Sequence, residues 1–231
     1  MSVRDNLARI EARIGQACER SGRKREDIRL MGVSKFQSLE AIEEVYRAGI
    51  RLFGESRVQE AKAKFGSFVP EMPDVELHCI GQLQRNKAKT AVQLFSCIQS
   101  VDRNELIVEL ANHCQREQKA IEILLELHTG ESSKTGYSDA DTLLDAAELI
   151  LSYPMLHLRG LMTMAPYTDD TKLIRRSFQS LVAAKTILLQ HFPELVLDIL
   201  SMGMSNDFEI AIEEGSTLLR IGTALFKGDE P

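Results

Sequence analysis

Short apolar runs alternate with amphipathic stretches along most of the chain. Runs of this kind, separated by helices, are typical of parallel strands that are covered on both faces. The pattern therefore predicts eight strands. They are Arg29–Ser34, Arg51–Gly54, Glu76–Ile80, Phe95–Ser100, Ile121–His128, Leu156–Met164, Leu195–Met202 and Thr217–Phe226.

Helical periodicity fills the intervals between these runs. An opening helix is predicted over Ser2–Ser21, where Leu7, Ile10 and Ile14 recur at helical spacing and Gly22 follows as a stop. Further helices are predicted at Leu39–Ala48, Arg57–Phe65, Asn104–Gln118, Ala140–Leu151, Leu173–Gln190 and Asp207–Glu213.

Eight strand–helix units close naturally into a (β/α)8 barrel, which is the fold we expect, with an extra N-terminal helix. A doubly wound open sheet is the alternative, although no glycine-rich dinucleotide fingerprint follows an early strand. We expect residues 1–231 to form a single domain. The last predicted strand ends near Phe226, so no room remains for a second domain.

Composition narrows the class of protein. The chain is 44% hydrophobic and 27% charged with a net charge of −6, which fits a soluble globular protein without a nucleic-acid partner. No apolar run reaches the roughly 18 residues that a membrane span needs. The cysteines lack the spacing of a zinc site, and no signal peptide is evident, so we expect a cytoplasmic protein without a metal. These cysteines are Cys18, Cys79, Cys97 and Cys114.

The first candidate for chemistry is Lys35, which directly follows the first predicted strand. Functional residues of α/β barrels lie at the C-terminal ends of strands. A lysine there can form a Schiff base if its surroundings favour the neutral amine. Position alone favours the alternative, a solvated loop lysine.

Two later segments have the character of a phosphate site. Leu200–Asp207 joins a strand to a helix with small and hydroxylated residues, which can bind phosphate or simply cap the helix. Arg220 lies inside an apolar strand and is followed by Gly222 and Thr223. A buried arginine needs an acceptor, either a ligand or an internal ion pair. Barrels often build a phosphate site after strands seven and eight.

Other residues are weaker candidates. His78 lies in a strand, where a single histidine is more often a satisfied core group than a catalyst. The loop Gly130–Gly136 is a candidate lid or an ordinary surface loop, and its spacing is not that of a P-loop.

Taken together, these segments resemble the pyridoxal phosphate homeostasis protein family. The matching stretches follow one another over nearly the whole chain. They are Val33–Lys35, Phe53–Glu60, His78–Lys87, Ser133–Gly136, Arg159–Pro166, Leu200–Asp207 and Arg220–Thr223.

The resemblance implies a barrel of PLP fold-type III, similar to the N-terminal domain of alanine racemase, with pyridoxal 5′-phosphate (PLP) as cofactor. It implies that Lys35 forms the aldimine and that Arg220 faces the pyridine nitrogen. A protonated arginine there makes the ring a poorer electron sink. Phosphate contacts are expected from Ser201, Ser205, Gly222 and Thr223, and further cofactor contacts from Ser56, His78 and Met202.

The chain departs from the family pattern at two positions. Ser56 stands where the family usually has asparagine, which shortens any reach toward the cofactor. Leu77 stands where a tryptophan is common, and this change concerns packing more than chemistry.

The function that the resemblance implies is PLP homeostasis, meaning storage, protection or delivery of the cofactor without dedicated catalysis. PLP-dependent apo-enzymes are possible transient partners, and we expect a monomer. One alternative is a PLP-dependent amino-acid racemase, which needs a second base that alanine racemases take from a domain not expected here. Another is a Schiff-base aldolase, which needs no arginine opposite a ring nitrogen.

Overall fold

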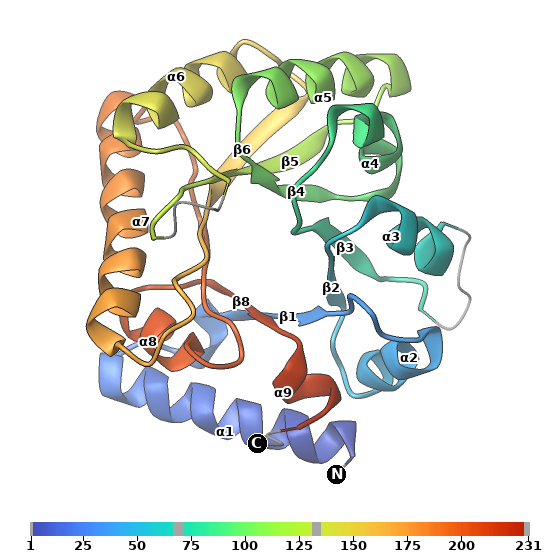
Figure 1. Ribbon diagram of the computed structural model, residues 1–231, viewed down its shortest axis with the longest axis vertical. Helices are drawn as coiled ribbons and strands as arrows, with labels where there is room; N and C mark the ends of the chain where they lie inside the picture. Colours follow the sequence, from blue (N-terminus) through green and yellow to red (C-terminus); the bar gives the residue numbers. More distant parts are fainter. Residues whose placement is uncertain (1, 67–71, 131–134, 229–231) are drawn as a thin grey trace.

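The computed structural model describes residues 2–66, 72–130 and 135–228. Within these residues the apolar runs form a closed barrel of parallel strands in sequential order (Figure 1). The strands are β1 (Arg29–Val33), β2 (Leu52–Glu55), β3 (Glu76–Cys79), β4 (Cys97–Val101), β5 (Ile121–Glu126), β6 (Leu156–Met162), β7 (Ile199–Ser201) and β8 (Leu218–Ile221). Pairing of β1 with β8, from Arg29 opposite Leu218 to Gly32 opposite Ile221, closes the barrel. The predicted barrel is confirmed, and the open sheet is excluded.

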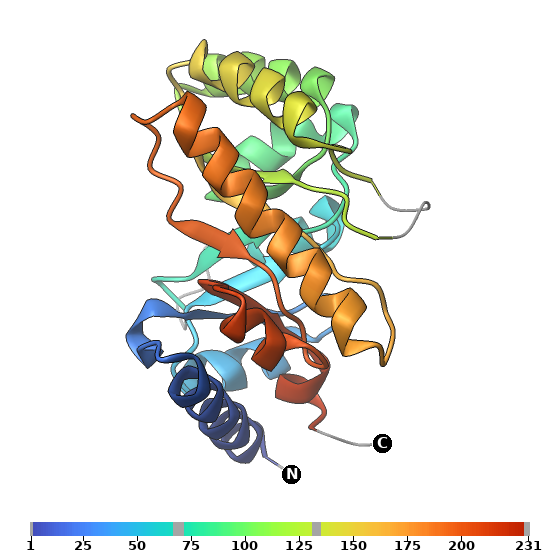
Figure 2. The same ribbon diagram turned by 90° about the vertical axis from the view of Figure 1, so that its left-hand side faces the viewer.

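Helices surround the barrel on its outside (Figure 1). Figure 2 shows the 21-residue helix α7 running obliquely across one side. The helices are α1 (Val3–Ser21), α2 (Leu39–Arg47), α3 (Val58–Phe65), α4 (Ala88–Leu94), α5 (Asn104–Glu117), α6 (Ala140–Leu151), α7 (Thr171–His191), α8 (Phe208–Glu213) and α9 (Thr223–Phe226), with 3-10 turns η1 (Arg25–Asp27) and η2 (Arg85–Lys87).

The extra N-terminal helix is confirmed and has a well-defined start and end. Ser2 and Asp5 form a capping box at its N-terminus, and Gly22 ends it in the left-handed conformation with φ 65°. The helix packs against α8 and α9. The ion pair between Arg13 and Glu209, at 2.9 Å, joins α1 to α8. The helix is therefore attached to the side of the barrel that carries β8.

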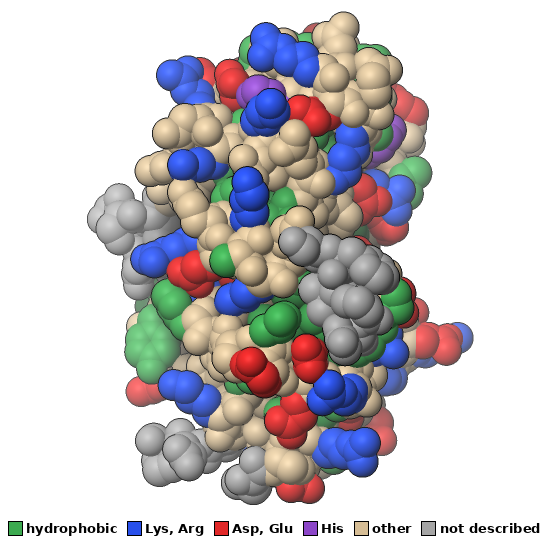
Figure 3. All heavy atoms as spheres, turned by 90° about the vertical axis from the view of Figure 1, so that its right-hand side faces the viewer, with side chains coloured by type: hydrophobic (Ala, Val, Ile, Leu, Met, Phe, Trp, Pro, Cys, Tyr) green, Lys and Arg blue, Asp and Glu red, His purple; other side chains and the backbone are tan. Residues whose placement is uncertain are grey.

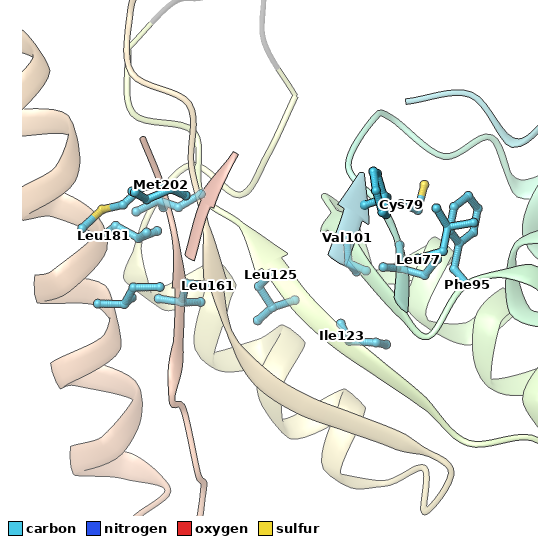
Figure 4. Close-up of a cluster of buried hydrophobic side chains, with 14 of the residues drawn as sticks. Leu77, Cys79, Phe95, Val101, Ile123, Leu125, Leu161, Leu181 and Met202 are labelled. Atoms are coloured by element: carbon cyan, nitrogen blue, oxygen red, sulfur yellow. The ribbon is translucent and has the colours of Figure 1, made fainter. Parts of the chain in front are cut away.

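Two hydrophobic clusters divide the core because successive side chains on a strand point to opposite faces. The outer cluster lies between strands and helices, where Leu161 of β6 and Leu181 of α7 belong to the same layer (Figure 4). Each large apolar side chain buried there contributes roughly 1.5–3 kcal/mol. The inner cluster lies inside the barrel and consists of Met31, Leu52, Cys97, Leu124, Met162, Ile199 and Leu218.

The structure corrects the boundaries of the last strand and adds a helix. β8 ends at Ile221, and Thr223–Phe226 forms α9, although the whole run was predicted as one strand. Gly222, with φ −112° and ψ −81°, leaves the extended conformation, so the apolar run continues as a helical turn. Helix α4 follows the turn after β3, a region for which the sequence pattern gave no helix bounds.

Acidic and basic side chains are interspersed over the face seen in Figure 3. No helix among the described residues is long and apolar enough to cross a membrane. The described part of the chain holds no group of three or more His, Cys, Asp or Glu side chains arranged to bind a metal. All four cysteines are free and buried, and burial raises the pKa of Cys79 to about 11.

Candidate functional site

Lys35 stands two residues beyond the end of β1, at the C-terminal mouth of the barrel. Met31 lies inside the barrel, and Lys35 stands in the turn that directly follows this strand. The side chain of Lys35 is exposed, and it forms no hydrogen bond or ion pair with any residue that the structure describes. The amine is therefore open to a ligand.

The backbone before Lys35 is firmly held. The Ser34 amide donates to the Gly54 carbonyl at 3.0 Å, and its hydroxyl donates to Glu55 Oε1 at 2.7 Å. The ammonium of Lys64 donates to the same carboxylate oxygen at 2.8 Å and to the Ser34 carbonyl at 2.9 Å. Glu55 is fully buried, so its charge needs this partner. The amine of Lys35 thus extends from a fixed base.

Phe36 follows in the left-handed conformation, with φ 64°. This conformation costs roughly 1–2 kcal/mol for a residue with a Cβ. The phenyl ring is 71% exposed, and the Arg57 guanidinium lies 5.7 Å from its centroid. The chain thus makes a sharp, strained turn directly after Lys35.

Arg220 lies on β8, opposite Met31 of β1, and is only 4% exposed. Its guanidinium donates to Ser201 Oγ at 2.7 Å and to the Thr163 carbonyl at 2.8 Å. Burial lowers the pKa of Arg220 to about 10, while Asp207 and Glu126 act in the opposite direction. The guanidinium therefore keeps its charge at neutral pH.

The chain segments that follow β7 and β8 lie side by side. The Ala224 amide donates to Ser205 Oγ at 3.3 Å, which links the two segments. Asp207 accepts from the Met204 amide at 2.6 Å and makes no side-chain cap on α8. Thr223 is exposed and Gly222 half-buried, so both are accessible at the mouth.

A family model described as "Alanine racemase, N-terminal domain" matches residues 6–230. A pyridoxal phosphate homeostasis protein of Vibrio alginolyticus is 39% identical over 228 residues, covering 97% of both chains. The chain belongs to this family of pyridoxal phosphate homeostasis proteins. A relative of the same name from Aquifex aeolicus is 37% identical over 226 residues, covering 98% of both chains.

Solved structures agree with this family. PipY of Synechococcus elongatus, solved with PLP bound, is 33% identical with a TM-score of 0.85, covering 97% of this chain and all of PipY. Alanine racemase of Clostridium difficile has a TM-score of 0.78 at 12% identity, covering 97% of this chain and 56% of the racemase. The second likeness shows the fold alone.

The fold brings most of the family's expected contact residues to one end of the barrel. Lys35, Ser56, Ser205, Gly222 and Thr223 all follow the C-terminal ends of their strands. Ser56 is half-buried, and a Cβ at Gly81 would lie 2.4 Å from its carbonyl oxygen. The cofactor roles of these residues stay predictions.

Three other expected contacts lie deeper. Ser201 and His78 are fully buried on β7 and β3. The Ser201 hydroxyl donates to Gln99 and accepts from Arg220, so its only hydrogen is already committed. Met202 belongs to the outer hydrophobic layer with Leu181 (Figure 4), so its side chain points away from the barrel interior. The geometry favours supporting roles for these residues.

The loop Gly130–Gly136 was a candidate lid, and Ser133 and Lys134 belong to a motif shared with the family. Residues 131–134, and with them this motif's first half, lie outside the described residues. The lid hypothesis stays a prediction.

Several residues of the site had no predicted role. Gln99 lies in an apolar strand and could have been noticed by the argument used for Arg220, that a buried polar group needs a partner. Glu55 and Lys64 are nine positions apart, and only the packing of α3 on β2 brings their charges together.

Proposed function

We propose that this protein binds PLP covalently through Lys35 and serves to hold the cofactor rather than to catalyse a reaction with it. The observation that carries the proposal is the exposed amine of Lys35, which has no partner among the described residues and stands at the mouth of a barrel shared with PipY. PLP supplies an aldehyde, which condenses with an amine to a C=N bond and releases one water, and a ring that withdraws electrons.

The residues at the mouth fit such a ligand. Arg220 provides a buried, oriented cation for the ring nitrogen. Ser205, Gly222 and Thr223 provide hydroxyl and backbone donors for the phosphate, and their accessible position supports that role. Ser56 belongs to the same rim. We propose one cofactor-binding domain over residues 1–231, acting as a monomer.

Arg220 also bears on the question of catalysis. Its guanidinium keeps its proton at neutral pH, so it donates to a ring nitrogen and does not protonate it. An unprotonated ring withdraws electrons more weakly than one paired with a carboxylic acid. This chemistry suits storage, protection or delivery of PLP.

The decisive experiment combines absorption spectroscopy with borohydride reduction and peptide mapping. The purified protein with PLP is expected to show a visible band, and reduction is expected to fix the cofactor on the peptide that contains Lys35. The Lys35→Ala variant should lack both. The matched control Lys62→Ala removes an exposed lysine of α3 and should keep both. A colourless protein that PLP cannot reconstitute, or a label on Lys64, would contradict the proposal.

The carrier role has its own test. The PLP-loaded protein is incubated with a PLP-dependent apo-enzyme, and enzyme activity is followed. Faster reactivation than by the same concentration of free PLP indicates delivery, whereas slower reactivation indicates storage. In a parallel assay with alanine, turnover near that of ordinary enzymes, roughly 1–10³ s⁻¹, would refute a purely holding role.

A further inference from the structure

A chain of hydrogen bonds runs through the interior of the barrel below Arg220. Arg220 donates to Ser201 Oγ at 2.7 Å, and Ser201 donates to Gln99 Oε1 at 2.6 Å. Gln99 Nε2 lies 2.8 Å from His78 Nδ1, and His78 Nε2 lies 2.8 Å from Glu76 Oε1. The chain crosses from β7 and β8 to β3 and β4, on the opposite wall (Figure 1).

The bonds of this network can be followed from donor to acceptor, starting at Arg220. A guanidinium only donates, so Ser201 accepts from Arg220, and it directs its one hydrogen to the Gln99 carbonyl. The Gln99 amide nitrogen then faces His78 Nδ1, which must accept, and the ring hydrogen sits on Nε2. Glu76 accepts it, and this hydrogen bond lowers the pKa of the carboxyl to about 2. In this arrangement every link joins one donor to one acceptor.

Burying the polar side chains of this hydrogen-bond network costs folding free energy. Ser201, Gln99 and His78 are completely buried. The inner hydrophobic cluster of the same barrel is apolar, with Met31 and Leu124 among its members. Apolar residues of similar volume fill such interiors at least as stably as a buried polar network does. Stability alone therefore does not account for this row of polar side chains.

We infer that Glu76, His78, Gln99 and Ser201 are positioning residues that hold the guanidinium of Arg220 in one orientation toward the cofactor ring. The inference rests on the proposed function for the ring contact, while the chain of hydrogen bonds stands independently of it. Glu76 anchors the chain at the N-terminal rim, at the opposite end of β3 from the mouth, and Arg29 pairs with it at 2.5 Å. A change at this distant rim thus acts on the cofactor site.

The test compares Glu76→Gln and Gln99→Leu with the matched control Glu122→Gln. Glu122 is a rim carboxylate of β5 with similar exposure, 37% against 35% for Glu76. It forms an ion pair with Arg159 and takes no part in the hydrogen-bond network. The readouts are the absorption maximum of bound PLP and its dissociation constant. Loss of one link is expected to shift the maximum and weaken binding by roughly three- to tenfold. Glu122→Gln should match the wild type.

Unchanged spectra and affinities in both chain variants, or an equal change in the control, would overturn the inference. If Gln99→Leu fails to fold, Glu76→Gln decides alone, because its position is half-exposed. A ¹⁵N NMR measurement of the His78 ring in the full chain without PLP adds an independent readout. We expect the ring hydrogen on Nε2 in the wild type and a mixture of tautomers in Glu76→Gln. A protein that binds no PLP but keeps this tautomer would refute the proposed function and leave the hydrogen-bond network standing.

Discussion

Lys35 follows strand β1, Arg220 lies on the neighbouring strand β8, and the fold holds these two basic side chains in opposite ways. Lys35 is exposed and has no partner among the described residues, and only its backbone base is fixed through Ser34. Arg220 is buried, and its head group is fixed by Ser201 and Thr163. The Lys35 side chain is free to react with a ligand, whereas the Arg220 side chain is held in one orientation.

The difference follows from what each group has to do. An amine that forms and breaks a bond with a cofactor must reach it and leave it, so a free side chain on a firm base is suitable. A cation that faces a ring must present one geometry, and burial with fixed hydrogen bonds achieves this. The predictions below test this division between a free and a fixed cation.

The largest expected effect is that of Lys35→Ala on covalent binding. The visible band of bound PLP should disappear completely, whereas the free energy of unfolding should change by no more than about 0.5 kcal/mol, as for other exposed sites. Urea denaturation and absorption spectra check both parts. A large loss of stability would show that Lys35 is held in the fold after all.

Arg220→Met should have the opposite pattern of effects, with a clear loss of stability and only a partial loss of PLP binding. We expect the apo-protein to lose about 1–3 kcal/mol of unfolding free energy, because Ser201 and the Thr163 carbonyl lose a buried partner. PLP should still form its bond with Lys35, but with an altered absorption maximum and weaker affinity. Denaturation of the apo-protein and PLP titration measure the two effects. An unchanged PLP affinity and absorption maximum would show that Arg220 does not contact the cofactor.

Phe36→Gly tests the strained turn after Lys35. Glycine adopts a positive φ without cost, so the variant should be more stable by roughly 0.5–1 kcal/mol, less what the lost ring contacts contribute. Gln118→Gly is a matched control, because Gln118 has φ 50° at the end of α5, away from the mouth. Both should gain stability in urea, but only Phe36→Gly should change the rate at which PLP binds. Equal rates of PLP binding in the two variants would show that the turn at Phe36 does not affect the reactivity of Lys35.

The smallest effect concerns Glu76 at low pH. Its pKa in the folded protein is about 2, below the usual 4.5, so its contribution to stability is present above pH 4.5 and is lost as the pH falls through about 2. The wild type should therefore lose more stability than Glu76→Gln between pH 4.5 and pH 2. Thermal melts across this range provide the measurement, and parallel curves would refute the shift.

Much of the architecture could be predicted because a barrel repeats one local pattern. Helix α6 has the predicted bounds, Ala140–Leu151, and strand β1 differs from its prediction by one residue. Element boundaries were predicted wrongly where a run is apolar throughout, because such a run shows neither the period of a strand nor that of a helix. The apolar run Thr217–Phe226 did not reveal where extended chain gives way to the helix α9. The predicted phosphate contact at Ser201 could not take account of Gln99, 102 positions away, which accepts its hydrogen.

The sequence by itself determined the alternation of strands and helices, the family, and the position of Lys35 at a strand end, because these depend on local periodicity and contiguous motifs. Only the tertiary structure decided which side each polar group faces and what it contacts. Closure of the barrel brings β4 opposite β7 and β8, so Gln99, Ser201 and Arg220 meet across the interior. Contacts of this kind depend on the register and phase of all eight strands together, which no single stretch of sequence contains.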